Sequence, residues 1–168
     1  EPRTAINATN TPGDADSLFK ITQPGSYYLT GNITGVVGKH GIEIAASGVT
    51  LDLNGFDLAG VPAMGAFDGV SATVAALTNI TVRNGSIRGW GAEGIDLFTS
   101  VAFYCRVEGV ISSNNLGGGI EVSHGSIVTN CSATGNVLGI RTRIGSIVIQ
   151  CVTMNNFGSG ITTDEGCS

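Results

Sequence analysis

The sequence is poor in charge. Only 12% of its 168 residues are Asp, Glu, Lys or Arg, about half the usual share, and the eight Lys and Arg residues form no cluster. With a net charge of −5, the chain lacks the basic surface that nucleic acid requires, so we expect no nucleic-acid partner. The exposed surface must therefore consist mainly of Ser, Thr, Asn and Gly.

Long apolar runs are also missing, although hydrophobic residues make up 42% of the chain. No run approaches the roughly 18 apolar residues of a membrane helix, so we expect no membrane span. From residue 41 onward no helical pattern with capping residues occurs, and the 26 glycines favour bends over helices. The chain also lacks the regularly spaced Leu and Asn residues of a leucine-rich repeat, and it lacks the helical segments of a βαβ fold.

What the sequence has in abundance is repetition. Six short strand-like segments open with glycine, at Gly41, Gly69, Gly94, Gly119, Gly139 and Gly160. Their spacings of 28, 25, 25, 20 and 21 residues are typical of a solenoid. Residues 119–131 and 139–151 match more deeply, because both begin with Gly-Ile, contain Gly-Ser-Ile-Val and end in Cys.

The repeat predicts an all-β fold. Each unit contains short runs in which apolar and polar residues alternate, separated by Gly, Asn and Ser. A period of about 20 residues accommodates three short strands and three bends, the geometry of a single-stranded parallel β-helix. We predict about six rungs over residues 41–168, preceded by an extended arm at 1–15 and a small cap at 16–40, with no evident C-terminal cap.

Stacking of the rungs converts the repeat into columns of neighbouring residues. Adjacent rungs lie about 4.8 Å apart, so equivalent outward residues should touch. One predicted column consists of Glu43, Ser71, Asp96, Glu121, Arg141 and Thr162. A second, two residues later in each unit, consists of Ala45, Thr73, Phe98, Ser123, Arg143 and Asp164. Asp96, Glu121, Arg141, Arg143 and His124 are therefore candidate site residues on one face.

Two interpretations of this face are open. Asp96 and Glu121 repel each other when stacked, a strain that bound Ca²⁺ or a raised pKa relieves. Arg141 suits binding of a uronate carboxylate, or it assists removal of the proton from the carbon next to that carboxylate. The simpler interpretation is a solvated ladder of mixed charge without a function, which the outward strand positions favour.

Other polar and aromatic residues are interpreted as structural. Cys131 and Cys151 are predicted to stack as buried thiols, with Cys105 joining their column after a one-residue shift. The asparagines after each strand suit turns, because Asn accepts left-handed backbone. Trp90, the single tryptophan, is interpreted as a packing residue.

The last unit predicts assembly. Gly160 opens a turn that the sequence does not complete before Ser168, which would leave a strand edge and apolar core exposed. A second copy of the chain, a further C-terminal segment or the arm of a neighbouring subunit would cover this edge. For assembly, we expect contacts between subunits through Ile161, Gly166 and Cys167. The N-terminal arm, with Pro2 and Ile6, is expected to bridge subunits.

Several segments carry a family resemblance. Residues 24–29 (PGSYYL), 41–44 (GIEI), 49–55 (VTLDLNG) and 80–85 (ITVRNG) resemble bacterial right-handed parallel β-helix proteins of the pectin lyase-like superfamily. The resemblance covers about residues 16–168 and implies a right-handed coil, in a protein that is secreted or displayed on a bacterial cell surface.

The same superfamily includes lyases, glycosidases, tailspikes and adhesins, so the resemblance implies no single activity. Ser123-His124-Gly125 and Arg143-Ile144-Gly145 only faintly echo two polygalacturonase motifs. The aspartate pair that such enzymes use to protonate the leaving group and activate water is not found in the sequence.

Two functions are therefore expected as alternatives. The first is a structural or adhesive β-solenoid that associates with itself, head to tail into fibres. The second is a carbohydrate-active enzyme or binding module, similar to a polysaccharide lyase or a glycoside hydrolase, with a polysaccharide on the face of Asp96, Glu121 and Arg141. No cofactor is expected apart from Ca²⁺ at Asp96 and Glu121.

Overall fold

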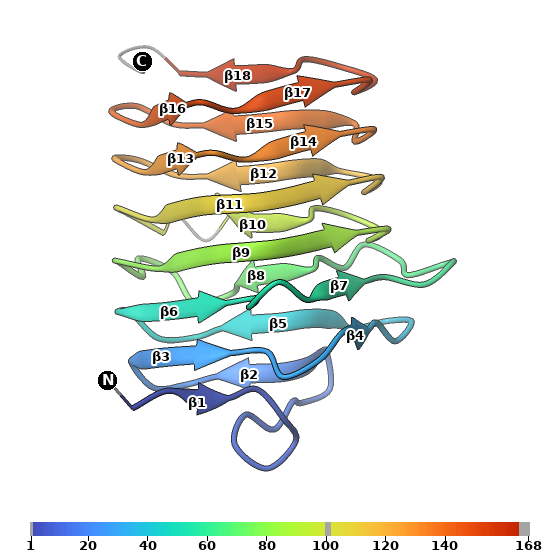
Figure 1. Ribbon diagram of the computed structural model, residues 1–168, viewed down its shortest axis with the longest axis vertical. Coiled ribbons are helices and arrows are strands. Elements are labelled where there is room, and N and C mark those ends of the chain that lie inside the picture. Colours follow the sequence, from blue (N-terminus) through green and yellow to red (C-terminus); the bar gives the residue numbers. More distant parts are fainter. Residues whose placement is uncertain (1, 100–101, 165–168) are drawn as a thin grey trace.

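The chain forms a coil of stacked strands. The computed structural model describes residues 2–99 and 102–164, which contain strands and no helix (Figure 1). All pairings between its named strands are parallel. The chain runs rightward along the front and leftward along the back while it climbs, which is a right-handed winding (Figure 1). The predicted parallel β-helix is confirmed.

Seven strands form the back sheet of Figure 1. They are β2 (Ser17–Ile21), β5 (His40–Ile44), β8 (Val70–Ala72), β10 (Ile95–Leu97), β12 (Gly118–Val122), β15 (Leu138–Thr142) and β18 (Ile161–Thr163). Six of them begin at or beside the predicted glycines. Strand β2 adds a seventh turn, which the glycine pattern does not indicate because β2 opens with Ser17.

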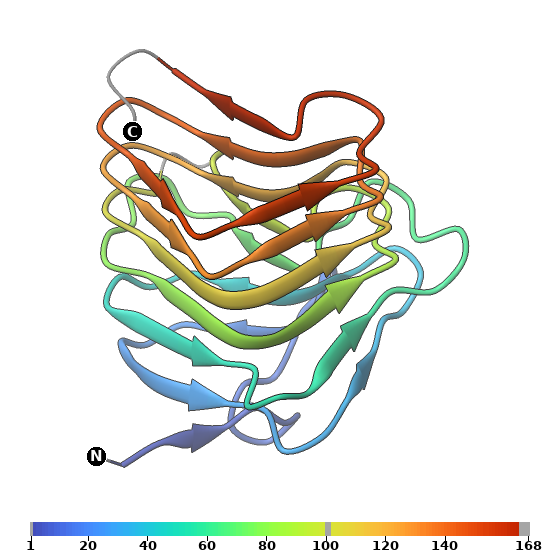
Figure 2. The same ribbon diagram turned by 45° about the horizontal axis from the view of Figure 1, so that its top comes forward.

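The front sheet bends into two limbs (Figure 2). The first limb contains β1 (Thr4–Ala5), β3 (Gly25–Tyr28), β6 (Val49–Asp52), β13 (Ile127–Thr129) and β16 (Ile147–Ile149). The second contains β4 (Ile33–Thr34), β7 (Asp57–Ala59), β14 (Ser132–Thr134) and β17 (Val152–Met154). Strands β9 (Thr81–Arg88) and β11 (Arg106–Ser113) run through both limbs.

The N-terminal residues expected to form an arm and a cap lie within the coil. Strand β1 pairs with β3, and Ile6 is only 5% exposed. The Arg3 guanidinium lies 2.9 Å from Asp52 Oδ2, and Arg83 lies 3.1 Å from the same oxygen. The start of the chain is thereby held against β6 and β9.

Asparagine forms many of the bends, as predicted. Six of the ten non-glycine residues with positive φ are asparagines: Asn54, Asn79, Asn84, Asn114, Asn130 and Asn155. Asn tolerates this left-handed backbone better than most residues, because its short polar side chain bonds locally.

Three other asparagines line an inner corner instead of turning the chain. Asn115, Asn136 and Asn156 stack in register. The side-chain oxygen of each accepts a hydrogen bond from the backbone N–H of the stacked residue one coil earlier. These hydrogen bonds join Trp90 to Asn115 (3.0 Å), Asn115 to Asn136 (3.0 Å) and Asn136 to Asn156 (2.9 Å). Trp90 ends the stack, fully buried, and its indole N–H donates to the Leu58 carbonyl at 3.1 Å. Its predicted packing role is confirmed.

The repeated glycine is required by this corner. A Cβ at Gly119 would lie 2.6 Å from Asn136 Nδ2 and 2.8 Å from the Gly139 carbonyl oxygen. Both distances are shorter than any real Cβ contact, so only glycine lets the back sheet approach the asparagine column.

The cysteines follow the prediction in part. The pairing of Ser132 with Val152 stacks the preceding Cys131 and Cys151. The prediction for Cys105 is wrong, because the pairing of Arg106 with Ile127 places Cys105 beside Ser126, whose Oγ accepts its N–H at 3.1 Å. All three thiols are free, while Cys167 lies outside the described residues.

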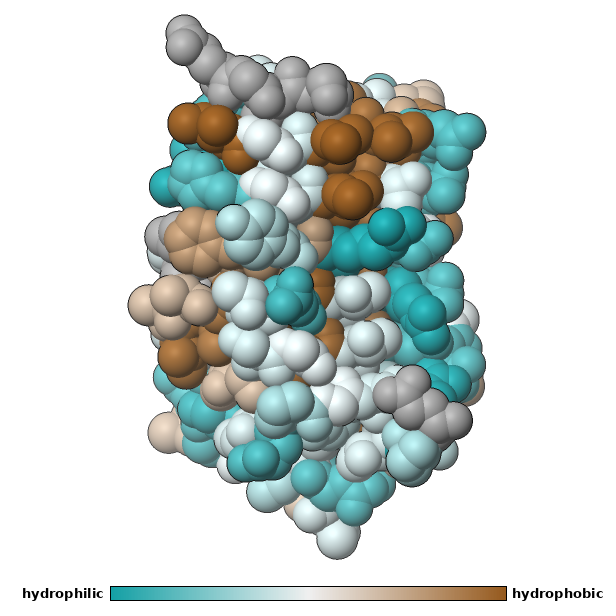
Figure 3. Space-filling view, turned by 90° about the vertical axis from the view of Figure 1, so that its left-hand side faces the viewer, coloured by the Kyte–Doolittle hydropathy of each residue, from teal (hydrophilic) through white to brown (hydrophobic). Residues whose placement is uncertain are grey.

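Apolar side chains are exposed toward the C-terminal coils. Figure 3 shows them gathered near the upper end of one side, above a more polar region. On β16 and β17 the outward residues Ile147, Ile149, Val152 and Met154 are each more than a third exposed. One coil earlier, the same positions hold Ile127, Thr129, Ser132 and Thr134.

The inner corner yields the first prediction. Gly119→Ala should lower the free energy of unfolding by about 2–4 kcal/mol, because the added methyl displaces the Asn136 amide and a neighbouring strand. Gly31→Ala is the matched control, because a Cβ there meets no atom within 4 Å. It should change stability by less than about 0.5 kcal/mol. Equal urea-unfolding midpoints for the two variants would contradict this role of the corner.

Candidate functional site

The outward side of the back sheet carries the predicted column of polar residues. Strand pairing stacks Lys20, Glu43, Ser71, Asp96, Glu121, Arg141 and Thr162 in register. Glu43, Asp96 and Glu121 are each less than a tenth exposed. Because these carboxylates are buried, the face is not the solvated ladder of the simpler interpretation.

A second ionisable column runs beside the first, and sequence reasoning missed it. His40, Asp68 and Glu93 each precede a glycine of the repeat, and the strand registers stack them on successive coils. The His40 Nδ1 lies 3.2 Å from Asp68 Oδ2. Burial alone would lower the pKa of His40, but the hydrogen bond and charge of Asp68 raise it. The signal in the sequence was the polar residue before Gly41, Gly69 and Gly94.

Three carboxyl groups of the two columns converge. One oxygen from each of Asp68, Glu93 and Asp96 lies within 4.8 Å of the others. Asp68 Oδ1 accepts the backbone N–H of Glu93 at 3.0 Å. Asp96 Oδ1 accepts the N–H groups of Phe98 and Thr99 at 2.8 and 2.9 Å. Backbone hydrogen bonds thus hold two of these carboxyls in place.

Glu93, in this cluster, has a raised pKa. Burial raises its pKa, and the hydrogen bond to Asp68 and the charges of Asp68 and Glu121 raise it further, to about 7. Burial also raises the pKa of Glu121, against the opposing charge of Arg141. Glu93 can therefore donate or accept a proton near neutral pH.

Two hollows flank the cluster. One, of about 450 Å³, is lined by Glu93, Glu121 and Arg141, and the other, of about 430 Å³, by Asp68 and Asp96. Thr99 lines both, so they lie side by side along the coil axis.

Glycines keep the first hollow open. A Cβ at Gly117 would lie 2.5 Å from Glu93 Oε1, and one at Gly118 would lie 2.4 Å from Glu121 Oε1. The run Gly117-Gly118-Gly119 therefore serves both this hollow and the inner corner.

The C-terminal end of the face is cationic and aromatic. The guanidinium groups of Arg141 and Arg143 lie 4.1 and 4.0 Å from the centre of the Phe98 ring, within the range of a cation–π interaction. Arg141 also lies 3.5 Å from Glu121 Oε2. The structure thus brings Asp96, Glu121, Arg141 and Arg143 together.

His124 belongs to a different surface. Its ring stacks on Phe103, with the ring centres 5.8 Å apart, and it lines neither hollow. The expectation that His124 shares the face of Asp96 and Glu121 is therefore wrong. It follows the end of β12, where the chain turns toward β13.

The oxygens that converge differ from the predicted calcium pair. Asp96 groups with Asp68 and Glu93, whereas Glu121 pairs with Arg141. Three carboxyl groups supply fewer oxygens than the six to eight that Ca²⁺ takes, unless some are bidentate or substrate and water add the rest.

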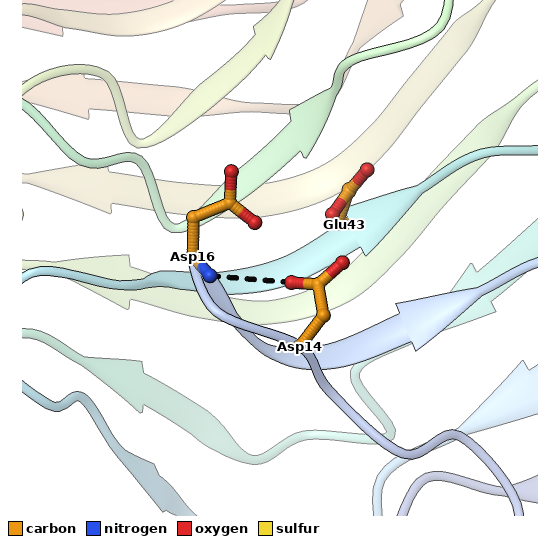
Figure 4. Close-up of side chains that lie close together, drawn as sticks. All are labelled: Asp14, Asp16 and Glu43. Carbon is orange, nitrogen blue, oxygen red and sulfur yellow. Dashed lines mark hydrogen bonds between the residues drawn. The ribbon is translucent and has the colours of Figure 1, made fainter.

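A second acidic group lies on the first coils, where Asp14, Asp16 and Glu43 converge (Figure 4). Lys20 Nζ, which the figure does not draw, lies 2.8 Å from both Asp14 Oδ2 and Glu43 Oε1. Its ammonium group already supplies the cation that these carboxylates require.

The residues predicted to mediate assembly are dispersed. Ile161 is 46% exposed and Pro2 is exposed, but Ile6 is buried in its own coil and cannot bridge to another subunit. Gly166 and Cys167 lie outside the described residues. No helix in the described part of the chain is long and apolar enough to cross a membrane.

Searches of family models, of curated proteins and of solved structures find no match for this chain.

The raised pKa of Glu93 yields the second prediction. Between about pH 4.5 and pH 7 the folded protein holds a proton that the unfolded chain has released, so stability falls as pH rises through this window. Glu93→Gln removes the ionisation and should stabilise the protein at about pH 8 by up to about 3 kcal/mol, with little effect at about pH 4. Urea unfolding at both pH values measures this, with Glu108→Gln on the exposed side of β11 as control. A stability difference between wild type and Glu93→Gln that is independent of pH would contradict it.

Proposed function

We propose that this protein is a carbohydrate-active β-solenoid that cleaves glycosidic bonds on the outward face of its back sheet. The observation that carries the proposal is Glu93, a carboxyl group with a pKa of about 7 that lines one hollow and has an oxygen within 4.8 Å of an oxygen of Asp96, which lines the other. A protonated carboxyl beside a second carboxyl is the combination that glycoside hydrolysis uses.

Each residue of the cluster has a role in the proposed reaction. Glu93 donates its proton to the glycosidic oxygen as the bond from that oxygen to the anomeric carbon breaks. Asp96, held by two backbone N–H groups, attacks that carbon and forms a glycosyl ester. Glu93, now a carboxylate, takes a proton from the water that hydrolyses the ester. Asp68 keeps the pKa of Glu93 high enough for the first step.

We propose retention of anomeric configuration, because the two carboxyl groups lie close together. An oxygen of Glu93 lies within 4.8 Å of an oxygen of Asp96. Retaining enzymes place the two groups about 5–5.5 Å apart, whereas inverting enzymes leave about 6.5–9.5 Å for a water molecule.

The charges along the face favour a polysaccharide that is uncharged at the point of cleavage. Asp68, Asp96 and Glu121 repel a uronate there, whereas the guanidinium of Arg141 at the C-terminal end of the first hollow suits one. Cleavage of uronates by a lyase mechanism would require Ca²⁺ at the carboxyl cluster to bridge the like charges.

The resemblance of several sequence segments to the bacterial pectin lyase-like superfamily agrees with this substrate class. It also supports secretion or display on a bacterial cell surface, as does the weakly charged composition. These assignments of family, source and location are part of the proposal.

The third prediction tests the reaction. The wild-type protein should release reducing ends from at least one member of a panel of neutral and uronate-containing polysaccharides. Glu93→Gln should lower the rate by about 10²–10⁴-fold, because general acid catalysis is lost. The first product, followed by NMR, should retain its anomeric configuration. Glu108→Gln, on the front sheet, is the control and should keep the wild-type rate.

A parallel arm with Ca²⁺ distinguishes the lyase alternative, which releases unsaturated uronides that absorb ultraviolet light. No product from any polymer, with or without Ca²⁺, would refute the proposed activity. So would an unchanged rate in Glu93→Gln.

A second candidate function is self-association, favoured by the exposed apolar residues of β16 and β17. Ile149 and Val152 are 47% and 54% exposed at positions that hold Thr129 and Ser132 one coil earlier. A second copy of the chain would bury them, and a repeated contact that does not close would give fibres. Such a structural or adhesive assembly is compatible with the carbohydrate site.

The fourth prediction tests this assembly by sedimentation velocity over a wide concentration range. The mean mass of the wild type should rise with concentration. The double variant Ile149→Thr/Val152→Ser, which copies the preceding coil, should associate at least about tenfold more weakly, because less apolar surface is buried. A wild-type protein that remains monomeric throughout would exclude self-association. Repeating the runs with a reductant separates apolar contacts from a disulfide at Cys167.

A further inference from the structure

One corner of the coil contains a residue that does not suit its backbone. The corner where the back sheet passes into the front sheet has a left-handed residue on five successive coils. They are Gly48, Asn79, Tyr104, Gly125 and Gly145, with φ of 68°, 56°, 55°, 65° and 75°. Four are glycine or asparagine, which adopt this backbone readily, whereas a bulky aromatic residue rarely does. Tyr104 is therefore the exception in a structural column.

Tyr104 is not placed there by burial. Its side chain is 65% exposed, so little packing energy offsets the unfavourable backbone. Its ring lies against Gly125, where a Cβ would approach the ring to 2.7 Å. Bare glycine backbone thus supports one side of the ring and leaves the rest to solvent. Strained backbone of this kind persists mainly where a function requires it.

Two further rings extend the surface. The Phe103 ring centre lies 6.2 Å from that of Tyr104 at an interplanar angle of 41°. His124 stacks on Phe103 at an interplanar angle of 21°. We call Phe103, Tyr104 and His124 the aromatic platform. The three rings, on two adjacent coils, thus form one aromatic cluster.

The platform adjoins the carbohydrate face. The Ala102 N–H donates to the Leu97 carbonyl at 3.3 Å, which holds Phe103 next to the end of β10. Phe98 and Thr99, which follow β10 directly, line the first hollow. The platform therefore begins beside the strand end that borders the first hollow.

We propose that the aromatic platform stacks on a pyranose ring of the polysaccharide, outside the hollows that hold the cleaved bond. The C–H groups on one side of a pyranose carry partial positive charge and pack against the negative face of an aromatic ring. The inference rests on the proposed function for the identity of the ligand as a glycan. It does not rest on the reaction, because none of the three rings belongs to the carboxyl cluster.

The fifth prediction measures stability as well as binding, because the unfavourable backbone of Tyr104 should lower the stability of the wild type. Tyr104→Asn copies Asn79 of the same column, so it should raise the urea-unfolding midpoint while it lowers affinity for the polysaccharide about five- to tenfold. Tyr104→Phe keeps the ring and should bind within about twofold of the wild type. Phe157→Asn removes an aromatic residue that is 88% exposed elsewhere and should not affect binding. Affinity electrophoresis in gels that contain the polysaccharide panel measures these affinities.

The outcomes separate this inference from the proposed reaction. Weaker binding by Tyr104→Asn with wild-type binding by Phe157→Asn supports the platform, even if no polymer is cleaved. Wild-type affinity in Tyr104→Asn overturns the platform, even if Glu93→Gln is inactive. A wild-type protein that no polymer retards also overturns it. So does a change of sedimentation in Tyr104→Asn without a change in glycan binding, because the ring would then contact protein.

Discussion

The stack depends on close packing at one inner corner, where the glycine column of the back sheet passes the asparagine column. At Gly119 the space for a side chain is taken by the Asn136 amide and by the next strand. That amide is itself required, because its oxygen accepts the Asn115 N–H and its nitrogen donates to the Ser112 carbonyl at 3.1 Å. A buried group left without such a partner costs about 1–3 kcal/mol. If the strand shifted by one residue, a Cβ would occupy the place of Gly119 and the Asn136 amide would lose its hydrogen-bond partners. This corner therefore determines the register of the coils.

The register in turn determines the chemistry of the outer face. Glu93 stands one residue before Gly94 and Asp96 two residues after it, so each turn adds one residue to each polar column. Five of the chain's thirteen acidic residues lie there, namely Glu43, Asp68, Glu93, Asp96 and Glu121. Lys20 and Arg141 offset their repulsion at the two ends, and in the middle the repulsion contributes to the raised pKa of Glu93. A chain with little charge overall thus buries several of its carboxyl groups on one face.

The outer corners, where the left-handed residues turn the chain, are under a weaker constraint than the inner corner. They require a left-handed backbone, which Gly and Asn supply in most coils, but their side chains are exposed and not enclosed between two sheets. Substitution there affects the local backbone without disturbing the register. This freedom is why one corner can carry Tyr104 and its neighbours as a surface feature while the coil continues unchanged.

The sequence by itself determined the coil and the columns within its regular units. The spacing of Gly41 to Gly160 and the alternation after each glycine were sufficient to predict the parallel β-helix and the stacking from Glu43 to Thr162. The alignment of Cys131 with Cys151 was predictable for the same reason, because identical spacing gives identical register. The packing of Trp90 was predictable because it is a single tryptophan in a glycine-rich bend.

Only the tertiary structure decided what happens between those regular segments. Asp68 and Glu93 lie before the strands, in loops of unequal length, so their contact with Asp96 depends on how each loop returns to the stack. Unequal loops also placed Cys105 outside the cysteine column and put His124 against Phe103. The N-terminal turn escaped prediction because Ser17 opens β2 without the glycine signal. Repetition specifies the register of strands, whereas pKa values and pockets depend on distances across corners, which no repeat encodes.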